Sequence, residues 1–128
     1  MSIIDLLLET DVEKLQAKHN KNYEIKRLSK ALGEKFIITC YPLTHEQVAH
    51  IGEISKTNTD MKLNAVLEAC RIEGKRFNNK ELMDKFGVVT PTDLLNKLFL
   101  PGELYEIYEV INTLSGYSKD AVKEVKNS

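Results

Sequence analysis

The sequence predicts an α+β fold that is mostly helical, with a short N-terminal arm and a β-hairpin followed by a bundle of about five short helices. After Pro42, apolar residues recur at three- and four-residue spacing between capping residues and glycines, which is typical of short amphipathic helices. Residues 36–41 are instead a β-branched and aromatic run typical of a strand. The 128 residues, 42% of them hydrophobic, can bury a core without disulfides or metal.

Residues 1–22 are predicted to form an arm that is partly helical. Ser2 and Asp5 can cap a short helix at its first turn. This helix places four apolar side chains on one side: Ile3, Ile4, Leu7 and Leu8. The polar stretch 18–22 then breaks the helix, so the arm is expected to be loosely attached.

Residues 23–41 fit two patterns. Apolar residues from Ile25 to Phe36 keep helical spacing, whereas the run that begins at Phe36 is strand-like. Gly33, beside Glu34 and Lys35, suits a turn. We therefore predict two strands, 23–28 and 36–41, paired as a hairpin with a longer loop.

Residues 44–116 are predicted to form the helical bundle. Thr44 caps the first helix, whose expected face is Val48, Ile51 and Ile54. The second helix runs from about Asp60 to near Gly74, and Phe77 follows it in a loop.

Glycines and prolines bound the remaining three helices. The third helix ends at Gly87, the fourth opens with Thr90 and Pro91, and the fifth runs from Pro101 to Gly116. Residues 23–117 are therefore predicted to be a single globular domain, hairpin 23–41 included, and residues 118–128 a polar, flexible tail.

Composition argues against several classes of protein. The net charge of −1 gives no global field to attract nucleic acid or an anionic membrane. Cys40 and Cys70 fit no short metal spacing, so we expect two buried thiols. The N-terminus has no basic leader, and Leu6-Leu7-Leu8 is too short to span a bilayer, which predicts a cytoplasmic protein with no membrane partner.

The sequence contains no recognisable catalytic motif. His45 and His50 lie five residues apart, so on a helix they diverge by about 140° and do not form a metal pair. The glycines are scattered singly, which excludes a phosphate loop. A row of carboxylates, Glu103, Glu106 and Glu109, is typical of a solvated helix face. We therefore expect no catalytic residue, no metal and no cofactor.

One local charge asymmetry lies between Glu13 and Lys35, where seven basic side chains stand against three acidic ones. A solvated hairpin face explains it best, because Tyr23 is the only aromatic residue in the segment before Phe36. The local excess of basic side chains leaves one alternative function open, that of a small DNA-binding regulator.

Three segments in the second half resemble, in order and spacing, the XkdN-like tail assembly chaperones of phages and phage-derived contractile particles. They are FGVVTP at 86–91, LFLPGE at 98–103 and INTLSGY at 111–117. The residues that carry the resemblance are Gly87, Pro91, Pro101, Gly102, Glu103, Leu114, Ser115 and Gly116. Most of them also punctuate or fill helices, so we interpret them as structural rather than as a binding site.

The resemblance implies a non-enzymatic factor that binds the tape measure protein and helps recruit tail tube subunits. It implies action in the host cytoplasm, absence from the mature particle and, in such families, a longer form made by frameshifting. A chaperone needs exposed apolar surface, and the arm residues Ile3, Ile4, Leu7 and Leu8 are the best candidates. The alternative within the same setting is a minor structural tail protein retained in the particle.

Overall fold

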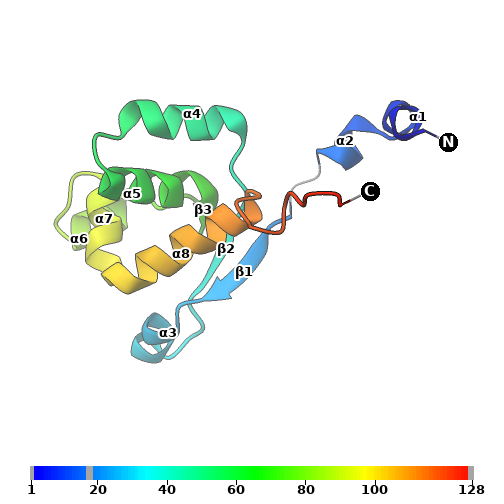
Figure 1. The fold of residues 1–128 in the computed structure, drawn as a ribbon. Helices are drawn as coiled ribbons and strands as arrows, with labels where there is room; N and C mark the ends of the chain where they lie inside the picture. Colours follow the sequence, from blue (N-terminus) through cyan, green and yellow to red (C-terminus); the bar gives the residue numbers. More distant parts are fainter. Residues whose placement is uncertain (1, 17–18, 127–128) are drawn as a thin grey trace.

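The computed structural model describes residues 2–16 and 19–126, which form eight helices and one small sheet (Figure 1). This is the mostly helical α+β fold that the sequence predicts. The helices are α1 (Ile3–Glu9), α2 (Val12–Leu15), α3 (Lys26–Leu32), α4 (His45–Ile54), α5 (Asn58–Ala69), α6 (Lys80–Lys85), α7 (Pro91–Leu98) and α8 (Pro101–Leu114). The strands are β1 (Lys21–Glu24), β2 (Ile37–Cys40) and β3 (Cys70–Arg71). From here on, the arm denotes residues 3–15, which contain α1 and α2, and the body denotes residues 21–114.

The sheet is antiparallel throughout, in the order β1-β2-β3, which leaves β1 at one edge. Lys21 pairs with Cys40 and Glu24 with Ile37, so the predicted pairing of two strands is present. The strand predicted at 23–28 was wrong from Ile25 onward. It begins two residues earlier, at Lys21, and ends at Glu24, because Ile25 is the N-cap of α3. Gly33, with φ of +74°, ends this helix, and the Ser29 hydroxyl accepts a bond from the Phe36 amide that leads the chain into β2.

Helix α5 is the centre of the bundle, since it contacts α4, α7, α8 and β3. The Thr57 side chain caps its start at Asn58, two residues before the predicted one. The prediction that this helix continues towards Gly74 was wrong, because Cys70 leaves it to pair with Cys40 as strand β3. The third strand has only two residues, too few to show any periodicity.

Helix α4 begins and ends close to its predicted bounds, with Thr44 and Gln47 forming a capping box. Its predicted apolar face was only partly right. Ile51 is buried, whereas Val48 and Ile54 remain considerably exposed. The reason is that α4 lies on the outside of the bundle, where it packs chiefly on α5.

The core lies between the sheet, α5, α7 and α8. Three phenylalanines from different connecting segments meet in it, with ring centroids 6.1 Å apart for Phe36 and Phe99 and 5.7 Å apart for Phe77 and Phe99, both edge to face. Phe77 comes from the loop after β3, as predicted, and is buried. Each such fully buried side chain contributes about 1.5–3 kcal/mol of transfer free energy.

Candidate protein-binding surfaces

The arm begins with a capped helix, α1, whose residues are all exposed. The Ser2 hydroxyl accepts a bond from the Asp5 amide at 3.1 Å, and the Asp5 carboxylate accepts from the Ser2 amide at 3.4 Å. This capping box explains why so short a segment is helical. No residue of α1 or α2 is buried, and both helices project from the body (Figure 1).

The four arm residues that the sequence singles out lie exposed to solvent. The exposed fractions are 70% for Ile3, 69% for Ile4, 53% for Leu7 and 79% for Leu8. Leu6, Val12 and Leu15 are exposed as well, and the sequence analysis missed them. Val12 and Leu15 lie on α2, which the non-helical residues Thr10 and Asp11 separate from α1, so the helical spacing of the first four residues does not extend to them. Both helices of the arm therefore carry exposed apolar side chains, and Leu15 at the end of the arm lines a hollow together with Leu43 and Val48 of the body.

A second apolar surface is a groove of about 620 Å³ between β1, the start of α3 and α8. Tyr23, Leu100, Ile107 and Val110 are among its apolar lining residues. Its α3 wall carries Lys26 and Arg27, and its α8 wall carries Glu103 and Glu106. This groove could not be predicted from local sequence patterns, because it forms between residues such as Arg27 and Glu103, which are 76 positions apart.

Glu103 and Arg27 join the two walls of the groove. Arg27 donates to the two carboxylate oxygens of Glu103 at 2.9 and 3.0 Å and to the Leu98 carbonyl at 2.8 Å. Glu103 also accepts the Leu100 amide at 2.8 Å, which caps α8. The hydrogen bonds from Arg27 lower the pKa of Glu103, and the same contact raises the pKa of Arg27. Glu103 therefore fixes α3 against the start of α8.

The other signature residues in the first two segments lie at helix ends. Gly87, with φ of +67°, follows α6, where a side chain would be strained. Pro91 is the first residue of α7, whose start is capped by the Thr90 hydroxyl. Pro101 and Gly102 are the first two residues of α8.

The third segment closes α8 and links it to the sheet side of the body. Leu114 is partly buried against the core. The Ser115 hydroxyl donates to the Ile111 carbonyl at 2.7 Å and accepts the Leu43 amide at 2.9 Å. Gly116 follows with φ of +93°. These contacts support the interpretation of the signature residues as determinants of the fold.

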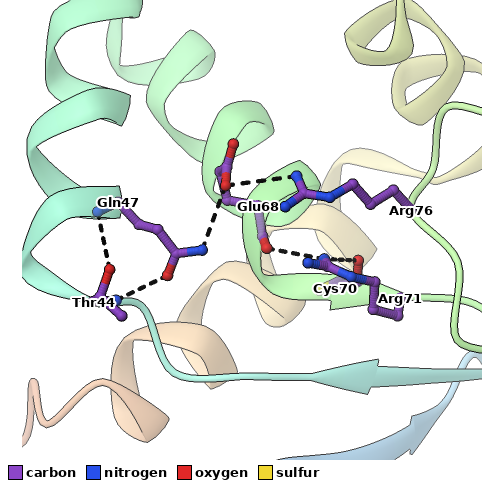
Figure 2. A network of polar contacts seen from close by, with 6 residues as sticks. All are labelled: Thr44, Gln47, Glu68, Cys70, Arg71 and Arg76. Carbon is purple, nitrogen blue, oxygen red and sulfur yellow. Dashed lines mark hydrogen bonds and ion pairs between the residues drawn. The ribbon is translucent and has the colours of Figure 1, made fainter.

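Glu68, near the end of α5, is the centre of a polar network (Figure 2). Its carboxylate accepts a hydrogen bond from the side-chain amide of Gln47 at 3.4 Å and forms an ion pair with Arg76 at 3.6 Å. The backbone carbonyl of Glu68 accepts a hydrogen bond from the Arg71 side chain at 2.9 Å. Gln47 also completes the cap of α4 with Thr44. The network thereby ties α4, α5, β3 and the following loop together.

Cys40 and Cys70 are both buried free thiols, as expected, although their proximity was not foreseen. Their sulfur atoms lie 3.4 Å apart across β2 and β3. The hydrogen bond with Cys40, together with burial, raises the pKa of Cys70. Because its raised pKa keeps the Cys70 thiol protonated at neutral pH, Cys70 is a poor nucleophile.

Other groups of chemical interest are dispersed. His45 and His50 are both exposed on α4, and residues 2–16 and 19–126 contain no group of three His, Cys, Asp or Glu side chains placed to hold a metal ion. Over the same residues, no helix is long and apolar enough to cross a membrane. The exposed arm and the groove are thus the two surfaces that stand out.

Comparison with known proteins identifies the class. A family model of phage tail assembly chaperones matches residues 4–126, nearly the whole chain. The chain belongs to the family described as phage XkdN-like tail assembly chaperone proteins, which confirms the resemblance carried by the three segments. No curated protein matches, and no solved structure does.

Proposed function

We propose that this chaperone binds the tape measure protein through the apolar stripe of its arm and helps recruit tail tube subunits during tail assembly. The observation that carries the proposal is the exposure of Ile3, Ile4, Leu7 and Leu8 in a member of a tail chaperone family. An amphipathic helix with an uncovered face is suited to pack against a helical client, where it would bury apolar surface from both partners.

Co-expression with the tape measure protein tests the proposal. The double variant Ile4→Glu, Leu7→Glu places carboxylates in the stripe without altering the body, so the soluble yield of client should fall to the level seen without the chaperone. Val89→Glu is the matched control, because Val89 is 86% exposed and lies on the body between α6 and α7. A client that is equally soluble with the double variant would sink the proposed binding site. A client that is soluble with no chaperone at all would sink the function.

We also propose that the protein acts in the host cytoplasm and is absent from the mature particle. Mass spectrometry of purified particles should then find it far below one copy per tail ring. Stoichiometric retention would instead identify a minor structural tail protein. The support for the proposed location is the role of an assembly chaperone, which is needed while the tail forms.

A further inference from the structure

We propose that Cys40 and Cys70 form an oxidation site, at which a peroxide converts the two thiols into an intramolecular disulfide between β2 and β3. They are the two cysteines of the chain, they lie 30 positions apart, and both are free and buried. The proposal concerns the body and goes beyond client binding, which we assign to the arm. Its support comes from the register of the two strands, the local structure around β3 and the position of Cys40 at the groove.

The register of β2 and β3 places the two cysteines directly opposite each other. The Tyr41 amide donates to the Ala69 carbonyl at 2.8 Å, so the adjacent pair, Cys40 and Cys70, occupies a non-hydrogen-bonded position of the ladder. Cα atoms at such a position lie about 4.5 Å apart. A disulfide spans Cα distances of about 4.4–6.8 Å, so the backbone is already suitably placed for the bond.

The two side chains also lie close to each other. Their sulfur atoms are 3.4 Å apart, and the exposed fraction of both residues is 0%. An S–S bond is about 2.05 Å long, so a small rotation of each side chain brings the sulfur atoms together without moving the strands. The reduced pair is therefore preorganised for one product, the intramolecular disulfide.

Cys40 is the thiol that reacts first. Cys40, and not Cys70, lines the groove of about 620 Å³ between β1, α3 and α8, so a small oxidant that enters the groove approaches Cys40. The hydrogen bond from Cys70 lowers the pKa of Cys40. This favours the thiolate of Cys40, which is the form that attacks an oxidant.

The structure around β3 permits the small opening that lets an oxidant reach the thiols. This strand has only two residues and forms an edge of the sheet. A tight turn follows it, in which Glu73 and Gly74 both have positive φ and the Ile72 and Lys75 backbones bond to each other. A short edge strand breaks few hydrogen bonds when it separates from its neighbour, so local opening is possible without unfolding of the body.

The oxidation balances with hydrogen peroxide as the two-electron oxidant. The Cys40 thiolate attacks one peroxide oxygen, so an S–O bond forms, the O–O bond breaks, and hydroxide leaves and takes up the proton that Cys40 released. The Cys70 sulfur then attacks the sulfenic acid on Cys40, which forms the S–S bond and breaks the S–O bond. The Cys70 proton joins the departing hydroxide as a second water. Two thiols and one peroxide thus give one disulfide and two waters.

Treatment of the folded chain with hydrogen peroxide tests the proposal. Thiols titrated after denaturation should fall from two to zero per chain, and the intact mass should fall by two hydrogen atoms without formation of a dimer. A dithiol reductant should restore both thiols. Two thiols that persist under conditions that fully oxidise free cysteine overturn the proposal, and so do intermolecular disulfides as the main product.

Single alanine variants identify the first thiol to react. Cys70→Ala leaves Cys40 without a second thiol, so a sulfenic acid should accumulate there and be trapped by a carbon nucleophile such as dimedone. Cys40→Ala is the matched control and should give at least about tenfold less adduct, because Cys70 does not line the groove and its raised pKa keeps its thiol protonated. Equal adducts on the two variants overturn the assignment of Cys40 as the site of attack.

Thermal unfolding checks that the disulfide fits the native fold. A cross-link that closes a loop of about 30 residues should raise the midpoint of the oxidised chain by about 10 °C over that of the reduced chain. An equal or lower midpoint would mean that the bond distorts the strands, and it would overturn the proposed geometry. The arm lies outside the closed loop, so the client solubility assay tests the proposed function independently.

Discussion

Helices α1 and α8 are built on the same sequence pattern and have opposite environments. Both begin with a carboxylate that accepts a backbone amide, from Asp5 in α1 and Glu103 in α8. Both carry aliphatic residues at three- and four-residue spacing. In α8 these residues, Leu104, Ile107 and Ile111, are buried, whereas α1 has no buried residue. An amphipathic pattern thus predicts a helix with an apolar face but does not say whether the partner of that face lies on the same chain.

The largest expected effect comes from shortening a buried side chain of α8. Ile111→Ala leaves a cavity beside a fully buried position and should cost about 2–5 kcal/mol of unfolding free energy. Urea denaturation followed by circular dichroism measures it. A cost below about 1 kcal/mol would mean that the surroundings of α8 collapse to fill the space, which would weaken the contrast with α1.

Removing the carboxylate that fixes α8 to α3 should have a smaller effect. Glu103→Gln keeps an acceptor for the Leu100 amide but loses the ion pair with Arg27, which should cost about 1 kcal/mol at neutral pH, given its partial exposure. Denaturation at pH 7 measures it, with Glu109→Gln as control for loss of a carboxylate elsewhere on α8.

The same pair predicts a dependence on pH. The pKa of Glu103 is lowered in the folded chain, so its stabilising contribution is fully present above its unfolded pKa, about 4.3, and is lost as the pH falls through the lower folded value. The stability difference between wild type and Glu103→Gln should therefore shrink below about pH 4.3. A difference that stays constant down to strongly acidic pH would contradict this account.

Capping residues give a matched pair between arm and body. Thr90→Ala removes the bond to the Asp93 amide at the start of α7 and should cost about 1 kcal/mol of global stability. Ser2→Ala removes the equivalent bond of α1 but should lower only the helicity of the arm, leaving the unfolding midpoint unchanged. Amide exchange resolved by residue distinguishes the two effects. A shift in midpoint for Ser2→Ala would show that the arm packs on the body.

The smallest expected effect is on the arm itself. Leu7→Ala should change the unfolding free energy by less than about 0.5 kcal/mol, because the side chain is half exposed and the helix that carries it has no buried residue. Denaturation under the same conditions as for Ile111→Ala measures it. Comparable losses for the two variants would overturn the distinction between α1 and α8.

The fold was largely predictable where local chemistry determines it. Thr44 and Thr90 cap helices in the structure as their sequence positions indicate, and Gly87 and Gly116 follow helix ends with positive φ. The errors occurred where tertiary contacts decide. Gly33 suits a turn between strands and the end of a helix equally well, and Cys70 leaves α5 only because β2 is there to pair with it.

The candidate site was predictable in part, for the same reason. The arm stripe follows from local periodicity, so its residues could be named from the sequence. The groove could not, because Lys26 and Leu100 are far apart along the chain and meet only after α8 packs against the sheet. The sequence placed Glu103 in one of the family segments, but it did not indicate that Glu103 binds Arg27.

Strand β1 forms one free edge of the sheet, and this edge is poorly suited to the addition of further strands. Strand β1 exposes unpaired backbone on its outer side over only four residues, and charged side chains, Lys21 and Glu24, stand at both ends of it. Short, charged edges resist the open-ended strand addition that leads to aggregation. At this edge the chain thus has little backbone to which a misfolded chain could add a strand.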